Sequence, residues 1–298
     1  MRFVSLVVLF FSLDAVAQVR PFQTTRLLST SGTGVASILV AESALLNPAT
    51  LAFFSETFVS YQNTKTTLRS SSDERKSLGR QGQGDGRHEG YFVFDNSGEA
   101  KGGLSYQRQR ENGFTRQRMT GTMAGSIGEG MALGLTYKHT DDLRPVWYGS
   151  RHKISHPLTV GFVWVARPNL TVGATWDDPT RAIPGESRAM TGLQYALTAD
   201  LLLIGDAGGD PTRSISDTSI LRAALQYHIF SDVFLRVGKF EDKAQNLEGE
   251  SWGASWIGPK LSLEFAMRNS RVADKKEASY IYQSEKLSDV SFALGMRF

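Results

Sequence analysis

Seven cationic residues and one acid form the part of the sequence best suited to bind a ligand. They occupy alternate positions in segments with a strand-like pattern, so their side chains would share one face. Arginine binds carboxylates through two parallel hydrogen bonds, and such a set could therefore hold an anionic molecule. Buried charges must also be paired or hydrated, so the same residues could instead join neighbouring strands through ion pairs. The set comprises Arg116, Arg118, Lys138, Arg222, Arg236, Arg268 and Arg297, with Glu264 as the expected main counter-charge.

Catalytic groups are not brought together by the sequence. A barrel phospholipase needs serine, histidine and an amide or acid at one rim, and a barrel protease uses aspartate and histidine at the outer rim. His228 is close to Ser231 and Asp232, but it lies at a tight turn on the wrong side for either enzyme. His139 precedes two aspartates near a polar loop, where acids are ordinarily solvated. We expect no catalytic residues and no enzymatic activity.

Metal and cofactor sites are not expected either. The chain has no cysteine, which excludes disulfides, thiolate chemistry and cysteine-ligated metals. His152 and His156 would share one face of a strand, but no acid lies between them. Asp206, Asp210 and Asp217 weakly resemble a calcium loop, although Gly and Asp are also ordinary turn residues. We predict no metal and no cofactor.

The elements that would position the cationic set are β-strands. From Val290 to Phe298 every second residue is large and apolar, and the residues between them are small or polar. Strict alternation is typical of a strand with one apolar face. A soluble sandwich could end in this way. A terminal aromatic residue on such a strand, however, resembles the closing strand of a bacterial outer-membrane barrel, whose last residues are read by the insertion machinery.

The N-terminal residues predict export. Arg2 precedes an apolar run over residues 3–13, and Ala15-Val16-Ala17 precedes Gln18, which together indicate a secretory signal peptide over residues 1–17. The run is too short to span a bilayer as a helix, and no second run of spanning length follows. Since only helices and closed barrels satisfy the backbone in lipid, we expect a periplasmic protein or an outer-membrane barrel. A formal net charge of +3 is too small to indicate nucleic-acid binding.

Alternating segments separated by turn residues fill the chain after residue 55, and helical periodicity is nearly absent. Short connections carry the Gly, Asn, Asp and Pro residues that hairpin turns need. Short and long connections alternate, as in outer-membrane barrels, whose short turns are periplasmic. We predict fourteen strands, with twelve as the alternative: residues 56–65, 89–95, 101–110, 114–127, 131–140, 153–166, 170–177, 188–197, 201–206, 219–230, 233–240, 249–257, 261–268 and 289–298.

Predicted strands such as residues 131–140, 153–166 and 261–268 have one large apolar face and one face that mixes small residues with charges. Leu133, Leu135 and Tyr137, for example, alternate with Gly134 and Thr136. A soluble sandwich would bury the apolar face, whereas a barrel would turn it to lipid and the polar face to the lumen. Alternation alone does not decide between the two. Combined with the signal peptide, the even strand number and the terminal Phe298, it predicts an all-β, antiparallel transmembrane barrel over residues 55–298.

Residues 18–54 differ from the barrel segment and are too few to form a core alone. They contain Gly32-Thr-Gly34-Val-Ala-Ser37 and then Asn47-Pro48-Ala49, with a short helix expected near residues 42–46. Pro48 disfavours helix at Asn47 and predicts a turn. We expect this segment to lie in the lumen as a small plug.

These two motifs directly before a fourteen-strand barrel resemble the long-chain fatty acid transporter family of outer membranes. The resemblance implies a monomeric barrel in which Asn47, Pro48 and Ala49 belong to an N-terminal hatch. It also implies that hydrophobic ligands such as fatty acids are captured outside and pass through the barrel wall when the hatch shifts. Barrels of protein-export systems share the motif, so a non-transporting structural or assembly barrel is the alternative. A general diffusion porin would have an open lumen. The expected partners are outer-membrane lipids, a hydrophobic ligand and, through Phe298, the insertion machinery.

Overall fold

The computed structural model describes residues 20–38, 40–69, 85–98, 101–111, 114–143, 152–183, 185–272, 276–277, 280–281 and 286–298. The predicted signal peptide over residues 1–17 and the start of the predicted plug, residues 18 and 19, lie outside these ranges.

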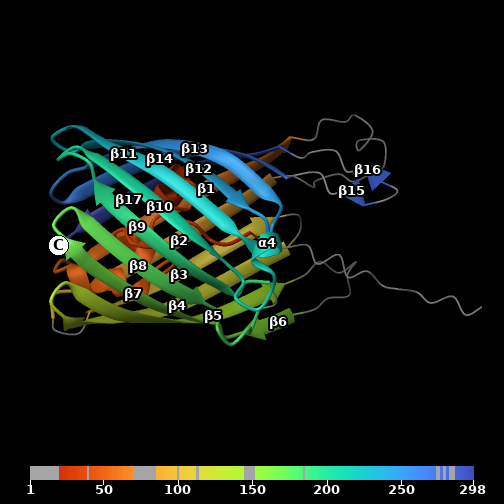
Figure 1. The fold of residues 1–298 in the computed structure, drawn as a ribbon, viewed down its shortest axis with the longest axis horizontal. Helices are drawn as coiled ribbons and strands as arrows, with labels where there is room; N and C mark the ends of the chain where they lie inside the picture. Colours follow the sequence, from red (N-terminus) through yellow and green to blue (C-terminus); the bar gives the residue numbers. More distant parts are fainter. Residues whose placement is uncertain are drawn as a thin grey trace, which may run out of the picture.

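Fourteen antiparallel strands close into a barrel (Figure 1), which confirms the predicted fold class and the larger strand number. Neighbours along the chain pair with each other, β1 pairs with β17, and pairing of β4 with β5 completes the ring. Closure leaves no unpaired edge, which lipid would not tolerate. The strands are β1 (Phe58–Arg69), β2 (Asp85–Asp95), β3 (Lys101–Glu111), β4 (Phe114–Gly128), β5 (Met131–Leu143), β7 (Leu158–Arg167), β8 (Leu170–Asp177), β9 (Arg188–Ala196), β10 (Leu201–Gly209), β11 (Ile220–Phe230), β12 (Val233–Asp242), β13 (Leu247–Ile257), β14 (Leu261–Val272) and β17 (Lys286–Arg297).

The predicted strand over residues 153–166 is interrupted. Short β6 (His152–Ser155) pairs with the outer end of β5, and β7 then pairs with the remainder of β5. Pro157 separates the two pieces because it has no N–H to donate to a ladder, although its carbonyl still accepts from Lys138 N at 2.9 Å.

Short turns gather at the barrel end that carries Phe58 and Arg297, which are register partners. The opposite end carries longer connections, including residues 178–187, residues 210–219 with α4 (Ile215–Thr218), and the small β15 (Lys276–Glu277) and β16 (Tyr280–Ile281) (Figure 1). The predicted alternation of short and long connections is wrong at two places on that end. The connection between β3 and β4 is short there, as it already is between the predicted strands 101–110 and 114–127. The connection 243–246 is short because β12 and β13 extend beyond their predicted limits.

The barrel has its apolar side outward. Leu104, Met119 and Met123 are 59–69% exposed, whereas Gln107 and Gln109 on the opposite side of the same wall are buried. A soluble protein with this pattern would present its apolar side chains to water. The distribution therefore fits lipid on the outside and a polar interior.

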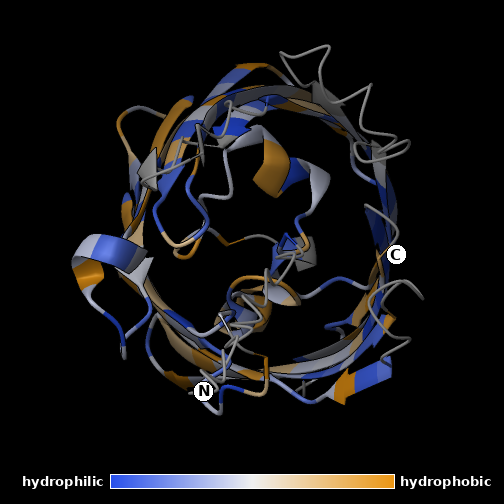
Figure 2. Ribbon diagram, turned by 90° about the vertical axis from the view of Figure 1, so that its right-hand side faces the viewer, coloured by the Kyte–Doolittle hydropathy of each residue, from blue (hydrophilic) through white to orange (hydrophobic). Residues whose placement is uncertain are grey.

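The N-terminal residues 20–54, hereafter the inner segment, lie within the ring of strands (Figure 2). They form α1 (Thr25–Ser29), α2 (Val40–Ser43) and the 3₁₀ helix η1 (Pro48–Phe53). The helix expected near residues 42–46 therefore begins earlier and ends at Ser43. No helix within the described ranges has the length and apolar character needed to cross a bilayer.

Lipid exposure of the outer face predicts a depth-dependent cost of charge. Leu225, at the centre of β11, is 41% exposed, and Leu221 lies nearer the long-connection end of the same face. We expect L225R to lower the free energy of unfolding in phospholipid vesicles by about 2–4 kcal/mol and L221R by about 1 kcal/mol or less. Denaturant titration in vesicles measures both values. Equal small costs would show that this face does not contact lipid.

Candidate functional site

Asn47 connects the inner segment to the barrel wall. Its side-chain Nδ2 donates to Val35 O at 2.6 Å and to Phe162 O in β7 at 3.1 Å. Its Oδ1 accepts from Ala49 N at 3.1 Å and caps η1, whose first residue is Pro48. Proline suits this position because the first helical N–H has no partner in any case. The side-chain amide of Asn47 thus joins the Gly32–Ser37 stretch to the Asn47–Ala49 motif.

Inward-facing glycines of the wall receive this part of the inner segment. A β-carbon on Gly161 of β7 would overlap Asn47 Oδ1, and one on Gly134 of β5 would overlap the Pro48–Ala49 peptide. Gly134 and Gly161 are direct register partners, so together they form one gap in the side-chain layer. Gly173 of β8 makes a similar close approach to Val35. We call Gly134, Gly161 and Gly173 the glycine seat.

Asp206 holds the neighbouring backbone. It faces the lumen from β10 and accepts from Gly34 N at 2.8 Å and Val35 N at 3.2 Å. The adjacent Arg222 of β11 donates from Nη1 to Gly32 O at 2.8 Å. Asp206 therefore binds the inner segment, and it does not converge with Asp210 and Asp217 on a calcium-type loop.

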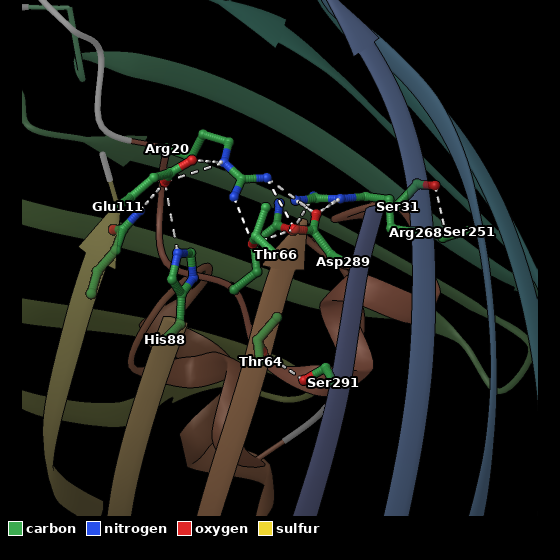
Figure 3. Close-up of polar contacts among 12 residues, drawn as sticks. Arg20, Ser31, Thr64, Thr66, His88, Glu111, Ser251, Arg268, Asp289 and Ser291 are labelled. Carbon is green, nitrogen blue, oxygen red and sulfur yellow. Dashed lines mark hydrogen bonds and ion pairs between the residues drawn. The ribbon is translucent and has the colours of Figure 1, made fainter. Parts of the chain in front are cut away.

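A second attachment is ionic and centres on Arg20 (Figure 3). Arg20 Nη1 lies 3.1 Å from Asp289 Oδ1 of β17, and its Nε lies 3.1 Å from Glu111 Oε1 of β3. Asp289 also accepts from Arg268 Nη2 at 2.7 Å and from Thr66 Oγ1 at 2.5 Å. Because Arg20 and Asp289 are buried, each charge depends on the other for compensation.

A third cluster joins β4 and β5 to the outer connections. Arg116 pairs with Asp142 at 2.6 Å and also with Glu186, to which Arg118 donates at 2.9 Å. Lys138 pairs with Asp177 at 2.5 Å. Glu186 belongs to the connection between β8 and β9 and is carried into the lumen, where the two arginines neutralise it.

The counter-charges differ from those expected. Glu264 makes no ion pair within 4.0 Å among the described residues. Arg236 instead donates to Gln226 Oε1 at 2.8 Å, and Arg297 lies 3.9 Å from Glu56. Acids at the outer ends of other strands and in one connection neutralise Arg116, Arg118, Lys138 and Arg268. Sequence alternation identified the inward cations but not which acids would be adjacent, since that depends on register across the barrel.

Two cavities lie on either side of the inner segment. The outer one, of about 80 Å³, is near Glu186 and Gln245 at the long-connection end and has apolar walls from Phe22, Leu27 and Met190. The inner one, of about 280 Å³, is at the short-turn end. It is lined by both polar and apolar residues, among them Arg26, Glu42, Phe58, Phe234, Glu264 and Leu294. The inner segment therefore divides the lumen.

The histidines do not assemble a catalytic or metal centre in the part of the chain that the structure describes. His228 lies at a short turn, bonded to Asp200 and to Ser231 O. His156 bonds to Tyr137 Oη at 2.7 Å and packs against His139, while His152 pairs with Asp141.

Several residues that hold the interior together were not singled out from sequence. Arg20, Glu111 and Asp289 are separated by up to 269 positions and meet only when the barrel closes. The glycines carry a weak signal, because Gly134 and Gly161 were visible as small residues on inward positions. Which of them would touch the inner segment could not be told from alternation.

Comparison with solved structures places this architecture among known outer-membrane barrels. The toluene transporter TbuX of Ralstonia pickettii superposes with a TM-score of 0.67 at 11% identity, over 93% of this chain and 98% of that chain. The monoaromatic hydrocarbon channel CymD gives 0.69 at 10% identity, over 92% and 97%. A Pseudomonas aeruginosa FadL homologue gives 0.62 at 14% identity, over 94% and 98%. No family model and no curated protein matches the sequence.

The chain therefore has the fold of the FadL-type outer-membrane barrels, and the resemblance noted in the sequence is confirmed at the level of fold. Its closed wall and apolar exterior are those of an outer-membrane protein, as predicted.

The glycine seat predicts that a single added methyl group loosens the inner segment. We expect G134A and G161A each to lower the free energy of unfolding by about 1–3 kcal/mol through overpacking. Both should also speed hydrogen exchange in residues 40–54, measured by mass spectrometry. G121A is the matched control, because its β-carbon would meet nothing closer than 3.9 Å. Unchanged exchange in G161A would contradict the steric role assigned to the glycine.

The Glu186 cluster predicts acid-dependent release of the connection between β8 and β9. Burial alone would raise the pKa of Glu186, but Arg118 and Arg116 lower it to about 2. A depressed pKa stabilises the folded state above the ordinary value near 4.5, and this contribution disappears as the pH falls toward 2. Hydrogen exchange in residues 178–187, expressed relative to the intrinsic rate at each pH, should therefore rise over that range. In E186Q this connection should exchange faster at pH 7, and its exchange should change much less on acidification. If the acid response of E186Q equals that of the wild type, other carboxylates cause that response.

Proposed function

We propose that this barrel takes up small hydrophobic molecules passively across the outer membrane, and that it accepts ligands with a carboxylate head. The observation that carries the proposal is Arg222 beside the outer cavity, whose lining is part apolar and part charged. Among the described residues no carboxylate lies within 4.0 Å of its guanidinium, and its buried Nε has no hydrogen-bond partner. Arg118, Lys138 and Arg188 around the same cavity are each paired with an acid.

A ligand carboxylate would supply the missing partner. The cavity walls from Phe22, Leu27, Leu45, Leu46 and Met190 would contact the apolar part of the same molecule. A volume of about 80 Å³ holds a head group and a few methylenes but not a long chain. A longer ligand therefore requires displacement of the inner segment, which agrees with the hatch role proposed for Asn47, Pro48 and Ala49.

The wall of β2 to β4 offers a lateral route to the bilayer. Elsewhere the inward face is mainly polar, but here Phe92 and Phe94 are buried on it and pack with Leu51 and Ala44 of the inner segment. On the outside the same strands form an apolar hollow of about 540 Å³, lined by residues that include Gly121 and Met123. A hydrophobic molecule that crosses here would meet apolar groups on both faces. Delivery to lipid avoids the aqueous passage that a pore would impose.

The similar structures support the general role, since their names describe transport of toluene and monoaromatic hydrocarbons and one is a FadL homologue. The alternative is a non-transporting barrel that serves as a structural or assembly partner of a surface or export complex. Such a barrel would not require a lumen arginine that lacks a carboxylate within 4.0 Å, since its neighbour Asp206 binds Gly34 N and Val35 N instead.

Binding of oleate and of toluene to the purified protein in detergent tests the proposal. We expect R222Q to weaken oleate binding by roughly tenfold or more, because a hydrogen bond to a charged group contributes about 1.5–3 kcal/mol. Toluene binding, which needs no cation, should change little. K239Q, on the outer face of β12, is the matched charge control.

Uptake in cells separates transport from binding. N47A/P48A should alter uptake of both probes while the barrel remains folded, as judged by heat-modifiable migration in gels. If wild-type protein binds neither probe but co-purifies with stoichiometric protein partners, the scaffold alternative holds.

A further inference from the structure

A row of tyrosines marks one depth on the outside of β1, β2 and β3. Tyr61 and Tyr91 are direct register partners, as are Tyr91 and Tyr106. Their ring centroids are 5.1 Å and 6.4 Å apart. Tyr61 is the fourth residue of β1 from the short-turn end and Tyr106 lies midway along β3, so half or more of each strand continues from the row toward the long-connection end.

Four cations follow on the same face, two to four residues beyond the tyrosines. Arg108 lies two residues from Tyr106, and Lys65, Arg87 and Arg110 lie four residues from their respective tyrosines. At about 3.3 Å per residue the second group is about 13 Å further along the strands. Arg87 and Arg110 are two residues and one residue from the long-connection ends of β2 and β3, the end expected to face the outer leaflet. We call Lys65, Arg87, Arg108 and Arg110 the basic patch.

The basic patch places like charges side by side. Lys65 is the register partner of Arg87, which is in turn the partner of Arg110. Like charges directly opposite one another destabilise a sheet unless an anion lies between them. Glu89 on the same face pairs with Arg87 at 3.1 Å and is the register partner of Arg108. Lys65 and Arg110 have no ion pair among the described residues, and Arg108 Nε is buried without a hydrogen-bond partner.

The corresponding face of β12, β13 and β14 is built differently. There Lys239 is the register partner of Glu250, and Glu248 is the partner of Arg271. Acids outnumber cations on this face, where Glu241 and Glu248 are also register partners, whereas cations are in excess on β1 to β3. The excess on β1 to β3 is therefore a local feature and not a general property of the rim.

We infer that the basic patch binds the phosphate groups of a lipid in the outer leaflet, the phosphorylated glycolipid of the bacterial outer membrane. Several phosphate oxygens on one molecule could meet several guanidinium groups at once, since arginine binds phosphate through paired hydrogen bonds. Acyl chains of the same lipid would lie against the apolar belt below the tyrosines, where Val93 and Leu104 are exposed. The inference depends on the barrel lying in a bilayer and not on which solute it transports.

Native mass spectrometry of the delipidated protein in detergent, titrated with diphosphoryl lipid A, tests this site. Wild-type protein should retain one lipid, and R87Q/R110Q should bind it about tenfold or more weakly, given the contribution of each cation near an anionic surface. The matched control, K239Q/R271Q, removes two cations from the acid-rich face of β12 and β14 and should bind as the wild type does. R110Q alone, with an intermediate loss, provides the test if the double variant fails to fold.

Two further arms identify what is recognised. Lipid A without phosphates should bind wild-type protein and R87Q/R110Q equally weakly. Inorganic phosphate at millimolar concentration should neither bind stoichiometrically nor displace the lipid. Three results would each overturn the inference. They are equal weakening of lipid binding in the two double variants, tight binding of the dephosphorylated lipid, and stoichiometric binding of inorganic phosphate. Oleate binding by R87Q/R110Q should match that of the wild type. Failure of the lipid-binding inference can therefore be distinguished from failure of the proposed transport function.

Discussion

The structure depends on the requirement that no backbone N–H or C=O remain unpaired in lipid. The fourteen strands meet it by pairing β4 with β5 and β1 with β17, so that no edge remains. Once the ring is closed, each strand must turn one face outward and one inward. A ring of this size encloses more space than the inward side chains can fill, and the inner segment occupies part of it. Closure thus determines the apolar exterior, the polar interior and the need for an internal segment.

The inner segment is held in two physically different ways. Around Asn47 the attachment is steric, because Gly134 and Gly161 leave room for backbone that any larger residue would exclude. Around Arg20 it is ionic, because buried Asp289 and Glu111 need a cation to offset the loss of water. The attachment at Asn47 depends on the shape of the wall, and the attachment at Arg20 depends on compensation of its charge. Together they hold both ends of the inner segment against different parts of the wall.

Much of the fold followed from the sequence because its signals are local. Alternation identified the strands, the wall and the inward position of Arg116, Arg222 and Arg268, and Pro48 marked the start of a turn. Pairing across the barrel was not accessible in the same way. Asp289 neutralises Arg20 only because β17 lies beside β1, and Glu186 reaches Arg116 only because a connection folds into the lumen. These contacts depend on register and loop path, which no single strand encodes.

The distribution of contacts within the lumen also indicates where the inner segment can move at least cost. At Asp206 and Asp289 it is held by directional bonds to buried charges, and breaking one of these leaves a charge unpaired. Against β2 to β4 its neighbours are Phe92 and Phe94, which contact Leu51 through apolar surface alone. Apolar contacts are not directional, so a hydrophobic solute can replace them without leaving a polar group unsatisfied. Under the proposed lateral route, displacement of the inner segment from β2 to β4 would therefore break apolar contacts and leave no buried charge unpaired.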